Sequence, residues 1–234
     1  MKIMKKLRKK INKLIKKYSI RGKYLNDSYS QYGEDLIASA FINEDGKGFY
    51  VDVGAHHPVR YSNSYRLYRL GWRGINIDSK PGTKKIFDEK RPRDINIEIG
   101  VGNSEEVLTY YMFNDSALNS FSPEVVKIYE KHSSFYLVGT KQIKIKPLEK
   151  ILDEYLPKGE EIDVLNVDVE GLDYEVLQSN NWQKYRPKII ICEISAGEDF
   201  DFKSVLNSEC YKFLNDKGYE LVAKNKHTMF FALS

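Results

Sequence analysis

The sequence is poor in the residues and runs that would place it in several common protein classes. Its two cysteines, Cys192 and Cys210, are too few for a disulfide framework and lack the spacing of a metal-ligand motif. It has no run of about eighteen apolar residues, so no segment is expected to span a membrane. It also lacks a complete G-x-G-x-x-G motif, which disfavours a dinucleotide such as NAD(P). These absences favour a globular protein of a reducing compartment whose ligand is not held through a pyrophosphate.

Acidic residues are absent from the first 23 positions, which carry eleven of the 37 Lys and Arg residues. The rest of the chain has 26 basic and 33 acidic side chains, so a basic arm precedes a mildly acidic domain. Apolar residues recur in the arm at steps of three and four, as on one side of a helix, and lysines fill the other sides. The apolar stripe consists of Met4, Leu7, Ile11, Leu14, Ile15 and Tyr18.

Several roles fit this arm, residues 1–23. A basic amphipathic helix over residues 1–18 would lie on an anionic membrane surface, and would keep a cytoplasmic protein at the inner face of the membrane. The arm could instead dock on a second subunit of a homo-oligomer or on another partner. It is not expected to be a secretory signal, because it has no continuous apolar segment and no cleavage site of small residues. Nucleic acid is not expected as a partner, since the domain behind the arm is acidic.

Apolar, β-branched runs alternate with helical patterns through residues 24–234, which are expected to form one domain. Strands that alternate with helices predict a Rossmann-like, doubly wound and mostly parallel α/β sheet, and the last two strands predict an antiparallel hairpin. The predicted strands are Phe49–Val53, Arg73–Ile77, Ile95–Val101, Val164–Val167, Lys188–Glu193, Tyr219–Lys224 and Met229–Leu233.

Residues 114–145 form a long insertion between core strands and show little regular pattern. A clear helix start occurs within it at Ser122-Pro123-Glu124. Because segments between core strands commonly carry substrate contacts, we expect the insertion to select the substrate. Glu106–Phe113, before the insertion, alternates like an edge strand, and Phe202–Lys217, after it, is predicted as one continuous helix.

Acidic and small residues follow the first two predicted strands at their carboxyl ends, where open α/β sheets bind ligands. Asp52 offers a carboxylate after the first strand, and Gly54 lets the backbone pass close to a ligand. A carboxylate there would repel a pyrophosphate, so a cationic ligand with ribose hydroxyls, such as S-adenosylmethionine, fits better. Asp78, at the second strand end, is placed to accept hydrogen bonds from a ribose diol. Helix capping by these carboxylates is the alternative.

A second group of acids follows the fourth and fifth strands. Asp168 and Glu170 are two residues apart and would point the same way while the strand continues, and Glu193 ends the neighbouring strand. These carboxylates could take the proton of an acceptor hydroxyl, or Asp168 and Glu193 could hold a divalent ion such as Mg²⁺. In the loop after the first strand, His57 is a candidate base and His56 a candidate cofactor contact. The alternatives are that Glu170 caps a helix and that the histidines lie in a surface turn.

Five short motifs occur in a fixed order along the domain. They are Ser30-Gln31-Tyr32-Gly33-Glu34-Asp35, Val51-Asp52-Val53-Gly54-Ala55, Ser62-Asn63-Ser64, Gly71-Trp72-Arg73-Gly74-Ile75-Asn76-Ile77-Asp78 and Asp168-Val169-Glu170-Gly171. Together they resemble the FkbM-type S-adenosylmethionine-dependent methyltransferases, with similarity over residues 28–233.

The resemblance implies a methyltransferase domain that transfers a methyl group to a hydroxyl, often that of a sugar in glycan or polysaccharide biosynthesis. Methylation of a small-molecule natural product and a non-catalytic binding module are the alternatives. It also implies that Asp168 and Glu170 face the methyl-transfer site. Pro58 departs from the family pattern, in a loop where a second small residue is common. The resemblance places Gln31, Asp52, Gly54, Asn63 and Asp78 at the cofactor, and their neighbours Ser30, Ala55 and His56, with Val101 at a strand end, complete the predicted set.

Overall fold

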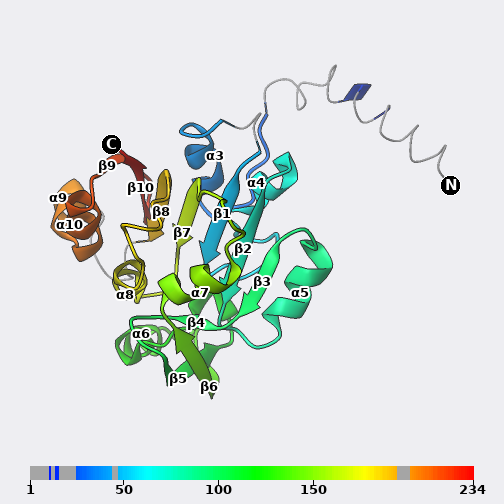
Figure 1. The fold of residues 1–234 in the computed structure, drawn as a ribbon. Helices are drawn as coiled ribbons and strands as arrows, with labels where there is room; N and C mark the ends of the chain where they lie inside the picture. The colour runs from blue at the N-terminus through cyan, green and yellow to red at the C-terminus, as the bar shows by residue number, and fades with distance from the viewer. Residues whose placement is uncertain (1–10, 12–13, 16–24, 44–46, 194–200) are drawn as a thin grey trace.

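The computed structural model describes residues 11, 14–15, 25–43, 47–193 and 201–234 (Figure 1). Its central sheet is built from β1 (Phe49–Val53), β2 (Arg73–Asp78), β3 (Ile95–Glu98), β7 (Val164–Val167), β8 (Ile189–Glu193), β9 (Tyr219–Lys224) and β10 (Thr228–Leu233). The strand order is β3-β2-β1-β7-β8-β10-β9. From β3 to β8 neighbouring strands are parallel, whereas β10 runs antiparallel to β8 and to β9. The predicted doubly wound sheet with a C-terminal antiparallel hairpin is confirmed.

Helices cover both faces of this sheet, as its apolar faces require (Figure 1). The larger apolar cluster lies under the helices that lead into β7, β8 and β9, and the smaller one lies under the helices before β1 and β2. The first group comprises α7 (Leu148–Tyr155), α8 (Asp173–Gln178) and α10 (Glu209–Asp216), and the second α3 (Glu34–Ser39) and α4 (Tyr65–Leu70); α5 (Thr83–Lys90) connects β2 to β3.

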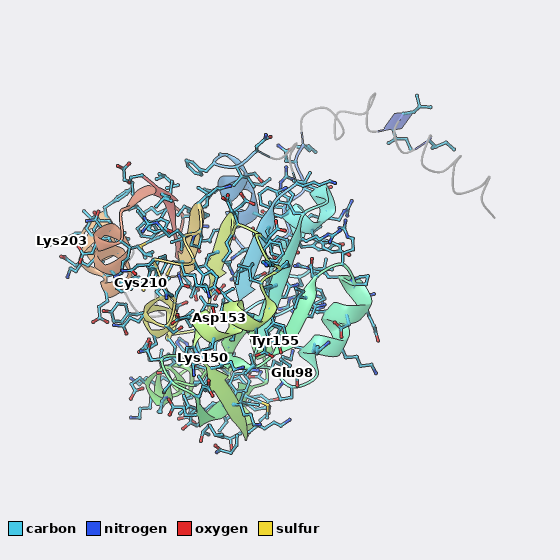
Figure 2. The ribbon with its side chains drawn as sticks, viewed as in Figure 1. Glu98, Lys150, Asp153, Tyr155, Lys203 and Cys210 are labelled. Carbon is cyan, nitrogen blue, oxygen red and sulfur yellow. The ribbon has the colours of Figure 1, made fainter. Side chains whose placement is uncertain are left out.

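The pattern of α7 shows why these segments fold against the sheet. Leu148, Ile151 and Leu152 recur at helical spacing and are buried in the larger cluster. Lys150 and Asp153 lie on the solvent side of the same helix (Figure 2), where they form ion pairs with charged residues of other segments. The helix is therefore held mainly by its apolar side.

A second, three-stranded sheet lies beyond the carboxyl end of β3. The predicted strand Ile95–Val101 is wrong in its last part, because the chain leaves the central sheet after Glu98 and its next strand pairs with the insertion. Gly100 permits this approach, since a Cβ atom there would overlap the Ile145 side chain. The sheet has the order β4-β6-β5, formed by β4 (Gly100–Val101), β6 (Leu137–Lys146) and β5 (Glu106–Phe113).

The insertion is more regular than its sequence suggests. β6 begins at Leu137, inside the segment expected to be irregular, and pairs antiparallel with β5. Between these strands lie the 3₁₀ helix η1 (Ser116–Leu118) and α6 (Pro123–Tyr129). The predicted start of α6 is confirmed, because Ser122 Oγ accepts a hydrogen bond from the backbone N–H of Val125 at 3.3 Å.

The segment predicted as one helix over Phe202–Lys217 is two helices, α9 (Phe202–Asn207) and α10. Ser208 separates them with an extended backbone, and its hydroxyl caps α10 by accepting from the N–H of Tyr211 at 3.2 Å. The apolar residues keep helical spacing across this break. A serine fits both the solvent side of one long helix and the N-cap of a second helix, so the sequence did not reveal the break.

The strand order reverses between β1 and β7, so the carboxyl ends of these strands form the switch point at which open α/β sheets bind ligands. Gly54, just after β1, has a φ of +82°, and a Cβ atom there would overlap the carbonyl oxygen of Asp168. Only glycine fits this approach. The loops after these two strands are therefore in direct contact.

Most of the basic arm lies outside the described residues, and the amphipathic helix over residues 1–18 stays a prediction. Ile11, Leu14 and Ile15 of its apolar stripe are described, and all three side chains are exposed. Among the helices that the structure describes, none is long and apolar enough to cross a membrane.

The position of β10 between β8 and β9 predicts a large stability loss on truncation of its buried side chain Phe230. Phe230→Ala should lower the free energy of unfolding by about 3–5 kcal/mol, because the ring is fully buried. Phe202→Ala is the matched control and should cost about 0.5 kcal/mol or less, because that ring is 65% exposed. Urea unfolding followed by circular dichroism measures both. Equal losses in the two variants would contradict this assignment of the core.

Candidate active site

A cavity of about 490 Å³ lies at the carboxyl ends of β1, β2, β7 and β8 and is closed on one side by the insertion. This volume is typical of small-molecule sites. Among the described residues that line it, seven are acidic and none is Lys or Arg. Such a lining favours a neutral or cationic ligand. The seven acids are Glu34, Asp52, Asp78, Asp115, Asp168, Glu170 and Glu193.

Two basic side chains approach the cavity from behind its wall. Lys80 Nζ donates to Ser116 Oγ at 2.8 Å, and the Arg60 guanidinium lies 3.9 Å from the carboxylate of Asp115. They compensate charge at the rim formed by η1, away from the acids that follow β7 and β8.

The fold brings most of the predicted site residues to this one cavity, but not Ser30 or His57. Ser30 Oγ donates to Asp35 Oδ1 at 2.9 Å, at the start of α3. His57 Nδ1 accepts from the backbone N–H groups of Val59 and Arg60, at 3.1 and 2.9 Å, so its ring shapes the loop. The predicted residues that do line the cavity are Gln31, Asp52, Gly54, Ala55, His56, Asn63, Asp78, Val101, Asp168, Glu170 and Glu193.

Asp78 presents a fixed carboxylate at the end of β2. Oδ2 accepts from the backbone N–H of His56 and Oδ1 from that of Lys80, each at 2.7 Å. Burial raises the pKa of Asp78 to about 6, and these hydrogen bonds oppose the shift. The carboxylate is therefore ionised at neutral pH, and each oxygen keeps a lone pair for a ligand hydroxyl.

Asp52 lines the cavity, and its carboxylate also binds two side chains of the protein. It accepts hydrogen bonds from Ser64 Oγ and from Asn166 Nδ2, the latter at 2.9 Å. Asn63 Nδ2 in turn donates to Asn166 Oδ1 at 3.0 Å. Asp52 thus ties the segment before α4 to β7, and its contact with a cofactor stays a prediction.

Asp168, Glu170 and Glu193 come together where β7 and β8 end, with side-chain oxygens within 4.8 Å of one another. Burial raises the pKa of Asp168 to about 6, and a hydrogen bond with Glu193 opposes this shift. Burial and the charge of Asp168 raise the pKa of Glu170 to about 8. The same causes raise the pKa of Glu193 well above its ordinary range. At neutral pH Asp168 is therefore ionised and Glu170 holds a proton, while a hydrogen bond joins Glu193 to Asp168. We call these three residues the acidic triad.

The insertion holds Glu170 in place. This residue has a left-handed backbone with a φ of 55°, a conformation that costs energy and persists where neighbours fix it. Tyr129 Oη donates to Glu170 Oε2 at 2.7 Å, and Ser120 Oγ donates to the Glu170 carbonyl oxygen at 2.8 Å. On the other side, the carboxylate of Asp173 accepts from the N–H of Gly171 at 3.3 Å. The triad is therefore shaped jointly by the central sheet and by α6.

Sequence reasoning missed many residues of the cavity wall, and Asn166, Tyr129 and His227 are three examples. Asn166 is a polar residue within the apolar run Val164–Val167, and that interruption was the available signal. Tyr129 lies in the insertion that was expected to select the substrate, but no pattern singled it out. His227 lies in the turn before β10, and the centre of its ring is 5.3 Å from the centre of the Tyr32 ring. Nothing in its sequence surroundings indicates this position.

The acidic triad also matches the oxygen ligands that Mg²⁺ or Ca²⁺ prefers. The predicted ligands Asp168 and Glu193 lie on neighbouring strands, and Glu170 would complete the set. The donor chemistry therefore fits either a divalent cation or shared protons.

Comparison with known proteins gives one family match. Residues 52–221 match the family described as the methyltransferase FkbM domain. The matched segment begins at Asp52 in β1 and ends at Leu221 in β9, so it covers more than half of the chain and contains both strand ends and the whole acidic triad. No curated protein shows a significant similarity to the chain.

The raised pKa of Glu170 predicts that the metal-free protein loses stability as the pH rises from 4.5 to about 8. In this window the folded protein keeps a proton that the unfolded chain has already released, so the free energy of unfolding falls with pH. Glu170→Gln removes this contribution. Across the same pH window, the free energy of unfolding of this variant should fall by on the order of 1 kcal/mol less than that of the wild type. Urea unfolding in the presence of EDTA measures the slopes.

Glu160→Gln is the control, because this carboxyl is exposed. It should keep the wild-type pH dependence. A wild-type slope in Glu170→Gln as well would show that this carboxyl does not bear the shift.

Proposed function

The chain belongs to the FkbM methyltransferase family, and on that premise we propose that it transfers a methyl group from S-adenosylmethionine to a hydroxyl of a neutral, sugar-containing acceptor. The observation that carries this proposal is the acidic cavity at the switch point of the sheet, without Lys or Arg among its described lining residues.

The half of the cavity formed by β1 and β2 suits S-adenosylmethionine. Bound there, this cofactor supplies an electrophilic methyl group on a sulfonium, and the positive charge suits an acidic lining. Asp78 would hold the ribose, with one hydroxyl on each carboxylate oxygen. Gln31, His56 and Asn63 line the same half from the surrounding loops.

Asp168 is the residue that we assign to the acceptor proton. An acceptor oxygen must lose its proton as it takes the methyl group, so a base at this point accelerates the step. With a pKa of about 6, Asp168 is ionised at neutral pH and is a stronger base than an ordinary aspartate. Glu170, with a pKa of about 8, holds its proton at neutral pH and is placed to donate a hydrogen bond that orients the acceptor, while Glu193 is hydrogen-bonded to Asp168.

The insertion side of the cavity supports a neutral sugar over a phosphorylated one. A phosphate or diphosphate group would meet the carboxylates of the acidic triad there, and the two basic side chains near this side, Lys80 and Arg60, are already engaged with Ser116 and Asp115. Phe121, Tyr129 and Phe135 also line this side, and aromatic rings pack well on the apolar C–H faces of sugars. The lining thus favours an uncharged glycan hydroxyl over that of a nucleotide sugar.

The acidic triad could instead assist methyl transfer by binding a divalent ion through Asp168 and Glu193. Bound there, the ion would lower the pKa of the acceptor hydroxyl, and no carboxylate would have to take up the proton alone. Chelation distinguishes the bound ion from Asp168 as the base. EDTA abolishes methyl transfer if the ion is required and leaves it unchanged if Asp168 acts as the base.

Methyl transfer from labelled S-adenosylmethionine tests the proposal, with neutral saccharides, their phosphorylated counterparts and hydroxylated natural products as acceptors. Label should enter neutral saccharides. Asp168→Asn should lower kcat by about 10²–10⁴-fold and leave the affinity for S-adenosylhomocysteine nearly unchanged, because only the base is lost. Asp216→Asn, on the exposed side of α10, is the control and should keep wild-type activity.

Other outcomes of this assay identify the alternatives. Label in natural products alone, or in phosphorylated sugars alone, would refute the neutral-glycan acceptor. A folded wild-type protein that does not bind S-adenosylhomocysteine in calorimetry would refute methyl transfer and favour a binding module.

We further propose that the basic arm holds the enzyme at an anionic membrane, where lipid-linked glycans are assembled. Its eleven basic residues and its apolar stripe support this role. Ile11, Leu14 and Ile15 are exposed, so these apolar side chains are free to enter a lipid interface.

Deletion of residues 1–18 should abolish co-sedimentation with vesicles that contain phosphatidylglycerol. The melting temperature of the domain should not change, and vesicles of phosphatidylcholine alone should retain little protein because the charge attraction is lost. Unchanged sedimentation of the truncated chain would exclude the membrane role. Loss of an oligomer on truncation, seen by light scattering, would instead support docking of the arm on a second subunit.

A further inference from the structure

Arg91 lies at the end of α5, fully buried behind the cofactor half of the cavity. It belongs to none of the motifs described above and does not line the cavity. A guanidinium withdrawn from water must find partners for its N–H groups, because unpaired buried charge is strongly destabilising. Its partners therefore indicate what it does.

The guanidinium makes four hydrogen bonds, and three of them go to one segment. Nε donates to the carbonyl oxygen of Pro58 at 2.8 Å, Nη2 to Ser62 Oγ at 2.6 Å and Nη1 to Ser64 Oγ at 2.7 Å. The fourth joins Nη1 to Asn76 Oδ1, in β2, at 3.0 Å. Arg91 thus binds residues 58–64, between β1 and α4, to the central sheet.

Aromatic rings enclose the same guanidinium. Its central carbon lies 5.1 Å from the ring centre of Tyr65, 5.3 Å from that of Phe87 and 5.8 Å from that of Tyr68. These contacts are cation–π in character and exclude water from the hydrogen bonds. The side chain is therefore held as one rigid, planar donor.

Arg91 rests on a row of polar side chains that crosses four strands at one register. Asn166, Asp52, Asn76 and Asn96 are neighbours across β7, β1, β2 and β3. Asn166 donates to Asp52 at 2.9 Å and Asn76 to Asn96 at 2.8 Å. We call these four residues the polar row. Ser64 accepts from Arg91 and donates to Asp52, so it joins the guanidinium to the row.

We propose that Arg91 is a positioning residue for S-adenosylmethionine: it fixes residues 58–64 against the polar row and so places Tyr61, Ser62 and Asn63 in the cofactor wall. The ligand named here rests on the proposed function. Lysine cannot replace this arginine, because one ammonium group cannot reach all four oxygens to which the planar guanidinium donates. Pro58 is the residue that departs from the family pattern, and its carbonyl oxygen accepts a hydrogen bond from the same guanidinium.

The test compares Arg91→Lys with Arg93→Lys. Arg93 is two residues away and also contacts Tyr68, donating to its carbonyl oxygen at 2.6 Å, but it is exposed. Calorimetric titration with S-adenosylhomocysteine, well below both melting transitions, should show affinity weakened by about tenfold or more in Arg91→Lys. Arg93→Lys should bind like the wild type.

Hydrogen–deuterium exchange supplies a signature that a merely stabilising residue would not produce. Amides of residues 56–66 should exchange faster in Arg91→Lys, while those of β1 and β7 keep wild-type protection. If Arg91→Lys does not fold, Ser64→Ala replaces it, since Ser64 is buried, lies outside the cavity lining and carries the link to Asp52.

Wild-type affinity in folded Arg91→Lys, or faster exchange spread over the whole sheet, would overturn the proposal. If the wild-type protein itself fails to bind S-adenosylhomocysteine, the proposed function falls. The exchange pattern then still decides whether Arg91 positions the loop.

Discussion

The polar row is the constraint on which the rest of the structure depends. Amide and carboxylate groups inside a sheet need hydrogen-bond partners, and the shared register of four strands pairs Asn166 with Asp52 and Asn76 with Asn96. A slip of one residue in any of these strands would turn its polar side chain to the opposite, apolar face. The row therefore aligns the carboxyl ends of the strands, and with them Gly54, Asp78 and Asp168.

From this frame the two halves of the cavity are built in different ways. The cofactor half comes from loops that hydrogen bonds tie back to the central sheet, with Asp78 fixed by two backbone N–H groups. The acceptor half is closed by the insertion, which reaches the acidic triad through Tyr129 and Ser120. Burial acts in both halves by raising the pKa of the carboxyl groups, to about 6 for Asp78 and Asp168 and to about 8 for Glu170.

The sequence predicted what short-range patterns determine. β-branched apolar runs located β1 and β7 to the residue, and the break into acidic and small residues located the cavity. Long-range pairing was out of reach: β4 leaves the central sheet only because β6, more than thirty residues later, is available to it. The role of His57 was hidden because two backbone N–H groups occupy its ring nitrogen. Arg91 sits between Lys90 and Pro92 in a charged stretch that is typical of a protein surface, so nothing local indicates its burial.

In the proposed function, the hydrogen bonds from the insertion to Glu170 link acceptor choice to reaction rate, two properties that are often separable in enzymes. Ser120 and Tyr129 belong to the segment that we propose faces the acceptor, and they also hold the strained backbone and the carboxyl of Glu170 in the acidic triad. Under the proposed function, an exchange of this segment between relatives would change both acceptor choice and reaction rate. Evolution of a new substrate in this scaffold has to preserve two hydroxyl donors, or rebuild the chemistry together with the specificity.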